Sequence, residues 1–206
     1  MRIISGRLRR RSLHAPRGHL TRPTTDRTRE SLFSLIESRM SLEGADVLDL
    51  FAGTGALGFE AVSRGAHAVT FVEKDGRVLK YTRRNAAELG VEEYCVFFRA
   101  DAVVYLERYH GPPFDLILAD PPYDLPALPR LPDLALRSLK PGCLFVLEHD
   151  RRHRFEAHAS LETTRSYGRT IVSVFRKEEA PAAGEEPEGD AAEGAGGSGP
   201  EARTSP

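Results

Sequence analysis

The chain has 206 residues, of which 40% are hydrophobic and 29% are charged. This length is typical of one domain with short extensions at its ends. No apolar stretch is long enough to cross a membrane and the first residues lack the apolar core of a secretory signal, so we expect a cytoplasmic protein without membrane contact. The two cysteines and seven histidines show no metal-ligand spacing. We therefore predict no disulfide framework, no metal site, and histidines that lie on the surface.

The net charge of −1 is unevenly distributed along the chain. Residues 1–29 contain nine arginines and one acid, whereas residues 178–206 contain eight acids and one arginine. The acidic segment has no valine, isoleucine, leucine, methionine or aromatic residue, so it cannot bury enough apolar surface to offset the entropy lost on ordering. We therefore predict a basic N-terminal arm at 1–29, a folded domain at 30–177 and a disordered acidic tail at 178–206.

Between the two ends, short apolar runs alternate with amphipathic stretches. Strands are predicted, in chain order, at Val47–Leu50, Ala68–Glu73, Cys95–Arg99, Phe114–Ala119 and Cys143–Leu147. Helices are predicted ahead of the first strand, at Ala56–Arg64, across Val78, Thr82, Ala86 and Leu89, after Asp101, and around Leu134–Leu139. Repeated βα units predict a parallel sheet with helices on both faces. Two final runs, Leu161–Tyr167 and Thr170–Arg176, are joined by only two residues, which indicates a hairpin and an antiparallel end to the sheet.

In such a sheet, ligands bind beyond the carboxyl ends of the strands, so the residues that follow each strand are candidate site residues. The second predicted strand ends at Glu73, and the third is followed by Asp101 and Ala102. The first strand is followed by a glycine turn that opens a helix, Phe51-Ala52-Gly53-Thr54-Gly55. This pattern alone leaves three interpretations open, namely a dinucleotide site, an S-adenosylmethionine site, and a glycine turn with only a structural role.

The fourth predicted strand is followed by the string Asp120-Pro121-Pro122-Tyr123. Two successive prolines remove two backbone donors and fix two φ angles, so the turn offers carbonyl acceptors. Asp120 adds a carboxylate and Tyr123 a flat aromatic face, a combination that suits the exocyclic amino group of a stacked base. A dehydrogenase has no evident use for this set. The alternative is that the prolines merely end a strand and the tyrosine packs on the surface.

Together these motifs resemble the seven-stranded, Rossmann-like S-adenosylmethionine-dependent methyltransferases that modify amino nitrogens of nucleic-acid bases. Two further strings narrow the resemblance to the RsmD-type 16S ribosomal RNA guanine-N2 methyltransferases. They are Arg22-Pro23-Thr24-Thr25-Asp26-Arg27 and Ser63-Arg64-Gly65-Ala66. The match covers residues 1–177 and excludes the tail. It departs from the expected pattern at Arg9-Arg10-Arg11, where a glycine is expected between basic residues, and this puts the local turn of the arm in question.

The resemblance implies an α/β fold with a mostly parallel seven-stranded sheet, an antiparallel C-terminal strand and a basic N-terminal arm. It implies S-adenosylmethionine as the cofactor, no metal, and a monomeric enzyme. The implied substrate is the exocyclic N2 of a guanine, guanine 966, in 16S ribosomal RNA of an assembling small ribosomal subunit. Three alternatives stay open: an adenine N6 or small-amine acceptor, a non-catalytic RNA-binding module that keeps the fold, and, more distantly, an NAD-dependent oxidoreductase.

The resemblance also assigns roles to individual residues. Asp49 and the turn from Phe51 to Gly55 would hold the methionine part of the cofactor, Glu73 the ribose hydroxyls, and Asp101 with the Ala102 amide the adenine edge. The catalytic residues would be Asp120, Pro121, Pro122 and Tyr123, with Asp120 and the Pro121 carbonyl accepting the amine hydrogens of the base. The RNA-binding residues of the arm would be Arg2, Arg7, Arg10, Arg22, Thr24 and Arg27.

Overall fold

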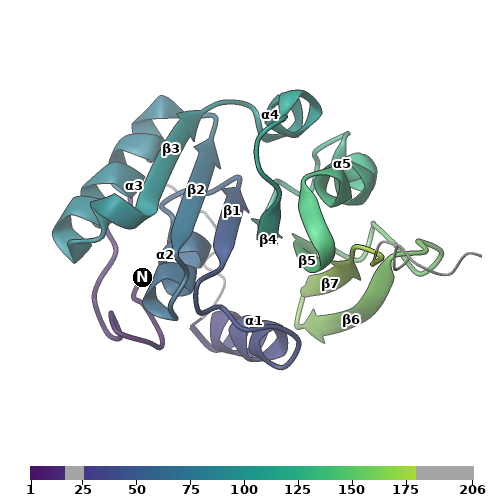
Figure 1. The fold of residues 1–206 in the computed structure, drawn as a ribbon, viewed down its shortest axis with the longest axis horizontal. Coiled ribbons are helices and arrows are strands. Elements are labelled where there is room, and N and C mark those ends of the chain that lie inside the picture. The colour runs from purple at the N-terminus through teal and green to yellow at the C-terminus, as the bar shows by residue number, and fades with distance from the viewer. Residues whose placement is uncertain (17–25, 180–206) are drawn as a thin grey trace, which may run out of the picture.

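The computed structural model describes residues 1–16 and 26–179, and its centre is a seven-stranded sheet with helices on both faces (Figure 1). The strands are β1 (Asp46–Leu50), β2 (Ala68–Glu73), β3 (Cys95–Arg99), β4 (Phe114–Ala119), β5 (Leu139–His149), β6 (Leu161–Tyr167) and β7 (Thr170–Arg176). The α-helices are α1 (Asp26–Glu37), α2 (Ala56–Ser63), α3 (Gly76–Leu89), α4 (Ala102–Arg108) and α5 (Leu131–Arg137). Two short 3₁₀ helices, η1 (Glu92–Tyr94) and η2 (Leu128–Arg130), precede β3 and α5.

The strand order is β3-β2-β1-β4-β5-β7-β6, and β1 to β5 run parallel. β7 pairs antiparallel with both β5 and β6, so the sheet ends in an antiparallel hairpin. The order reverses between β1 and β4, because β2 and β3 extend the sheet on one side of β1 while the later strands extend it on the other. A reversal of this kind opens a crevice at the carboxyl ends of the two strands. The predicted α/β fold is confirmed.

One predicted boundary is wrong, at the junction of α5 and β5. The helix expected around Leu134–Leu139 ends at Arg137, and Leu139 is already the first residue of β5. The Pro-Gly pair at 141 and 142 suggests a break in the sequence, but the strand absorbs it. The pairing with β4 shifts register here, and Gly142 takes a left-handed φ of 75°. The strand therefore begins four residues before its predicted start, Cys143.

Two apolar cores lie on opposite faces of the sheet because successive strand residues point in opposite directions. Val47 and Phe71 pack in the core under α1, α2 and α3, whereas Leu48 and Leu50 pack in the core under α4 and α5. In Figure 1, α4 and α5 lie together above the sheet and α1 lies below it. Each of these fully buried side chains contributes about 1.5–3 kcal/mol to stability. The two cores together fix the strand ends that carry the candidate site.

The first sixteen residues pack against the folded domain. Ile3 and Leu13 are buried in the core that faces α1, α2 and α3. The backbone N–H groups of Ile4 and Ser5 donate to the buried carboxylate of Glu60 in α2, at 2.8 and 3.0 Å. The predicted division at residue 29 falls within α1, where the Arg29 side chain is buried and donates to the Arg2 carbonyl at 2.6 Å. Residues 1–16 therefore share the core of the domain.

The departure at Arg9-Arg10-Arg11 leaves the turn of the arm in place. Arg10 has a φ of 69°, in the left-handed region where a glycine is favoured. The Arg10 N–H donates to the Ile3 carbonyl and the Ile3 N–H donates to the Arg11 carbonyl, both at 2.9 Å. A non-glycine residue in this conformation costs about 1–2 kcal/mol. The buried Ile3 side chain and the two hydrogen bonds hold the turn despite that cost.

The expectation that the histidines lie on the surface is wrong for His149, which is only 2% exposed. Its ring lies 2.8 Å from the Ser173 hydroxyl and 2.9 Å from the Asp150 carbonyl oxygen, so both ring nitrogens have partners. Arg22, Thr24 and most of the acidic tail lie outside the described residues, and the predictions for them stay predictions. Across residues 1–16 and 26–179, no helix has the length and apolar character that a bilayer crossing requires.

Candidate active site

The carboxyl ends of β1 to β4 meet at one edge of the sheet, and a predicted site residue lies at each of them. The glycine turn follows β1, Glu73 ends β2, Asp101 follows β3 and Asp120 follows β4. β1 lies between β2 and β4, so the glycine turn is at the centre of this edge. The topology therefore gathers four groups that are far apart in the sequence.

The glycine turn after β1 has an unusual backbone. Phe51, Gly53 and Gly55 all take left-handed φ angles, of 55°, 56° and 85°. A non-glycine residue in this region stores strain, and such strain concentrates at ligand-binding turns. A Cβ on Gly55 would come within 2.5 Å of the Phe59 ring, so this glycine is required for packing. A Cβ on Gly53 would meet only the Phe51 carbonyl oxygen, at 3.9 Å, so Gly53 leaves open space in which a ligand can approach the backbone.

Two side chains of α3 hold the glycine turn in place, and sequence reasoning missed their role. The Thr82 hydroxyl donates to the Gly53 carbonyl at 2.7 Å, and the Asn85 amide donates to the Thr54 carbonyl at 3.0 Å. Asn85 also accepts from the His14 N–H at 2.8 Å and so ties the turn to the N-terminal segment. The available signal was polarity, because both side chains lie on the inward face of α3, where apolar residues are expected.

Three carboxylates interact beneath this turn. Asp49 is 1% exposed and accepts from the Gly58 N–H at 2.9 Å. Burial raises the pKa of Asp49 well above its usual range; the hydrogen bond from Gly58 opposes this shift, whereas repulsion from Asp120 and Glu73 adds to it. Asp120 and Glu73 therefore lie within electrostatic reach of Asp49. A cationic ligand group in this place would relieve the repulsion.

Glu73 and Asp101 already accept hydrogen bonds from the backbone. Glu73 accepts from the N–H groups of Gly53 and Asp75, at 3.0 and 2.7 Å. Asp101 caps α4 by accepting from the Val103 N–H at 3.0 Å, and it pairs with Lys74 at 3.2 Å. Partial burial acts to raise the pKa of Asp101, but the hydrogen bonds from Lys74 and from the start of α4 hold it below its usual value. Ala102 is the first residue of α4, so its amide belongs to the N–H groups that have no partner within the helix.

The turn after β4 is held by elements that follow it in the chain. Pro121 is buried, while Asp120 and Tyr123 are half-buried. The sequence predicts carbonyl acceptors in this turn. One of them, the Pro122 carbonyl, already has a local partner, because it accepts a hydrogen bond from the Leu125 N–H at 3.0 Å. The Tyr123 carbonyl accepts a hydrogen bond from the Arg152 guanidinium. The Tyr123 side-chain hydroxyl lies 3.3 Å from the Thr170 hydroxyl. The ring nitrogen of His153 also lies 3.1 Å from that carbonyl.

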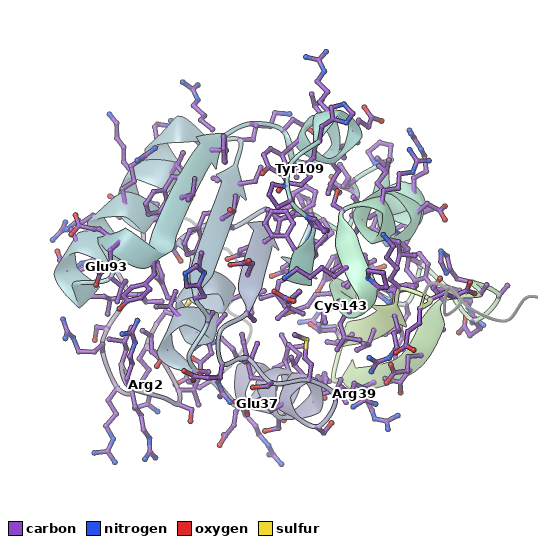
Figure 2. The ribbon with its side chains drawn as sticks, viewed as in Figure 1. Arg2, Glu37, Arg39, Glu93, Tyr109 and Cys143 are labelled. Atoms are coloured by element: carbon purple, nitrogen blue, oxygen red, sulfur yellow. The ribbon has the colours of Figure 1, made fainter. Side chains whose placement is uncertain are left out.

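The arginines predicted to contact RNA are spread over the molecule. Arg2 pairs with Asp26 at 2.8 Å on the surface below the sheet (Figure 2), and Arg10 is exposed at the turn of the arm. The Arg7 guanidinium lies 4.4 Å from the centre of the Tyr94 ring, and Tyr94 directly precedes β3. Arg7 is therefore at the edge of the sheet opposite to Asp120.

Arg27 is exposed in the first turn of α1. Arg29, two residues further on, is buried, and burial lowers its pKa. The negative charges of Glu60, Asp26 and Glu148 act in the other direction and raise this pKa. Glu148 lies next to the carboxyl end of β5, so this interaction places the start of α1 near the candidate site.

The fold and this edge define a Rossmann-like S-adenosylmethionine-dependent methyltransferase. An RNA methyltransferase of Salinibacter ruber, solved in complex with S-adenosyl-L-homocysteine, has the same fold, with a TM-score of 0.61 and 19% identity over 80% of this chain and 99% of that one. A structure described as "Putative methyltransferase yhhF from Escherichia coli" aligns with a TM-score of 0.76 and 31% identity over 87% of this chain and 99% of that one.

The family model described as conserved hypothetical protein 95 matches residues 1–176, and the chain belongs to that family, the RsmD family that its motifs resemble. A Bacillus subtilis relative, "Putative rRNA methyltransferase YlbH", is 36% identical over 86% of this chain and 99% of its own length. "Ribosomal RNA small subunit methyltransferase D" of Haemophilus influenzae is 33% identical over 73% of this chain and 79% of its own length. The family match ends just before the acidic tail.

Proposed function

We propose that this protein transfers a methyl group from S-adenosylmethionine to the exocyclic N2 of a guanine in 16S ribosomal RNA, guanine 966, in the assembling small ribosomal subunit. The names of its relatives support ribosomal RNA as the substrate. The observation that carries the proposal is the parallel pairing of β1 with β4, in which Leu50 lies opposite Ala119, so Asp120 leaves the sheet beside the glycine turn and within electrostatic reach of Asp49. An amine acceptor and a cationic methyl donor would meet between these two carboxylates.

The residues of the cofactor side fit S-adenosylmethionine by their chemistry. The buried, repelled carboxylate of Asp49 suits a cationic ammonium, and Gly53 leaves its backbone open to close approach. Glu73 at the end of β2 suits two ribose hydroxyls, and Asp101 with the Ala102 amide suits the edge of an adenine. Bound here, the cofactor supplies an electrophilic methyl group on a sulfonium.

The substrate side would activate a poor nucleophile. The lone pair of the guanine amino group is delocalised into the ring, which weakens the nitrogen as a nucleophile. The Asp120 carboxylate and the Pro121 carbonyl accept the two N–H hydrogens and draw the nitrogen toward a tetrahedral geometry. Tyr123 packs against the base and fixes its orientation. As the new N–C bond forms, the bond between the methyl group and the sulfonium sulfur would break and its electron pair would stay on sulfur as a neutral thioether. Asp120 or a water molecule takes the released proton, and most of the rate gain comes from positioning.

The test is methyl transfer to small-subunit particles isolated from cells that lack this protein. Labelled S-adenosylmethionine is added with the wild-type protein, and the RNA is digested to nucleosides. We expect labelled N2-methylguanosine with wild type and with Glu93→Ala, a control at an exposed acid beyond α3 (Figure 2), and little label with Asp120→Ala. Labelled N6-methyladenosine would assign the acceptor to adenine. The absence of transfer by the wild-type protein, together with binding of NADH, would contradict the proposal.

A further inference from the structure

A second cluster of positive charge lies beside the Asp-Pro-Pro-Tyr turn, in the chain after β5. Residues 149–154 read His-Asp-Arg-Arg-His-Arg, and the hairpin between β6 and β7 carries Arg169 at its tip. Ala119, the last residue of β4, pairs with Leu147, so the β5 end projects just beyond the end of β4. The hairpin tip reaches the same edge, because β7 runs antiparallel to β5 and begins beside its end. The sheet therefore places both basic segments at the edge that holds Asp120.

These two segments also contact Tyr123 directly. The Arg152 guanidinium donates to the Tyr123 carbonyl at 3.1 Å, and the His153 ring nitrogen lies 3.1 Å from the same oxygen. The Thr170 hydroxyl, next to Arg169, lies 3.3 Å from the Tyr123 hydroxyl. The basic segments thus form part of the wall around the residue that is proposed to hold the base.

The arginines of this cluster are not all engaged in folding contacts. Arg152 pairs with Asp150 at 2.6 Å. Partial burial acts to raise the pKa of Asp150, but the contact with Arg152 holds it below its usual value. Arg151, Arg154 and Arg169 are exposed, and none of the three forms an ion pair with another residue in the described part of the chain. By contrast, Arg2, Arg7 and Arg29 of the N-terminal region are paired, stacked or buried. Arg151, Arg154 and Arg169 therefore place free positive charge at the part of the strand edge that lies beside Asp120.

We propose that Arg151, Arg154 and Arg169 bind the RNA phosphates on either side of the target nucleotide, an inference that rests on the proposed function. A base that reacts at the Asp120 turn has to leave its stack, and this brings its flanking phosphates to the mouth of the site. Arginine binds phosphate oxygens through charge-assisted hydrogen bonds that fix position without reading sequence. Arg152 and His153 connect this phosphate-binding surface to Tyr123 through the carbonyl that both contact.

The test compares two double variants in binding to 16S ribosomal RNA transcribed in vitro, measured from low to high salt. The first is Arg151→Ala with Arg154→Ala. The control is Arg108→Ala with Arg137→Ala, two exposed arginines in the last turns of α4 and α5, which lie at the opposite edge of the sheet. Two lost phosphate contacts should reduce the slope of log affinity against log salt by about 1.5. We expect that reduction only in the first variant, with unchanged binding of S-adenosylmethionine and an unchanged thermal midpoint.

An unchanged salt slope in the first variant would overturn this inference, and so would an equal loss in the control. A wild-type protein that binds no 16S ribosomal RNA would overturn it as well. Methyl transfer by the same variants to small-subunit particles from cells that lack this protein separates the two claims. Transfer by the wild-type protein with no effect of Arg151→Ala and Arg154→Ala contradicts the phosphate-binding surface alone. Binding with the expected slope but without any transfer contradicts the proposed reaction and leaves the binding surface supported.

Discussion

The two halves of the strand edge differ in how their charged side chains are engaged. In the half formed by β1, β2 and β3, the carboxylates of Asp49, Glu73 and Asp101 lie in or directly after the strand ends, and Lys74 pairs with Asp101. The half beyond β4 and β5 presents Asp120 and Asp124 beside the Asp-Pro-Pro-Tyr turn, and is followed by the segment at 149–154, in which Arg151 and Arg154 are exposed and form no ion pair within the described residues. A sulfonium donor with an ammonium group suits the first half, and a polyanion suits the second. If the two proposed binding functions divide in this way, a substitution in one half should spare the ligand of the other.

Asp120→Ala should give the largest effect and should be confined to the substrate half. Loss of a positioned hydrogen-bond and proton acceptor should lower kcat by about 10²–10⁴-fold. The affinity for S-adenosylmethionine, measured by calorimetry, should stay nearly the same. Turnover at the wild-type level would remove the proposed role of Asp120.

Asp49→Asn should act on the cofactor half and weaken the binding of S-adenosylmethionine. Loss of a charged partner for the ammonium should reduce S-adenosylmethionine affinity by about tenfold to a hundredfold, because hydrogen bonds to charged groups are worth about 1.5–3 kcal/mol. In the wild type, affinity should fall as the pH drops through the raised pKa of Asp49, since protonation removes the charge. Calorimetric titrations at several pH values would test both statements, and a pH-independent affinity would contradict the role of Asp49.

Asp49→Asn should also raise the stability of the folded protein at neutral pH. The pKa of Asp49 is raised in the folded protein, so the folded state binds this proton more tightly than the unfolded state does. The contribution of Asp49 to stability is therefore fully present below the ordinary aspartate range and is lost as the pH rises through the raised pKa. A neutral asparagine side chain at this position would remove that loss, and the thermal midpoint of Asp49→Asn should exceed that of wild type at neutral pH. A lower midpoint would show that the carboxylate stabilises the fold.

Arg27→Ala should have a smaller effect, limited to RNA. Arg27 is exposed at the start of α1, which the interaction of Arg29 with Glu148 places near the end of β5. We expect kcat/KM for RNA to fall by several-fold and the salt slope to fall by about 1, as for one lost phosphate contact, with cofactor affinity unchanged. An unchanged rate on RNA would refute a role for Arg27.

Arg7→Ala should have the smallest effect on RNA. Its guanidinium stacks on Tyr94 at the opposite edge of the sheet, so its loss should cost about 0.5–1 kcal/mol of stability. RNA affinity should be nearly that of wild type at physiological salt. A loss of RNA affinity as large as that of Arg27→Ala would mean that the RNA also contacts the opposite edge.

The sequence predicts the part of the site that directly follows each strand. β2, β3 and β4 are largely apolar runs, so their ends, and with them Glu73, Asp101 and Asp120, can be located from the pattern alone. The residues that hold these turns in place through hydrogen bonds cannot be located in this way. Asn85 reaches Thr54, and Arg152 reaches Tyr123, across distances along the chain that only packing sets.

Counting charged residues along the sequence also does not show which of them are free to bind a ligand. The nine arginines of residues 1–29 suggest a free basic arm, yet Arg29 is 1% exposed and Arg7 is stacked on a ring. The shorter run at 149–154 is less conspicuous in the sequence, because Asp150 offsets part of its charge. Only the strand pairing shows that this run lies beside Tyr123.

The most direct test of the central claim is a map of modified nucleotides in 16S ribosomal RNA from cells with and without this protein. We predict N2-methylguanosine at one guanine, guanine 966, that disappears with the protein, returns with the wild-type chain, and stays absent with Asp120→Ala. An identical set of modified nucleotides in cells with and without the protein would contradict methyl transfer to this RNA.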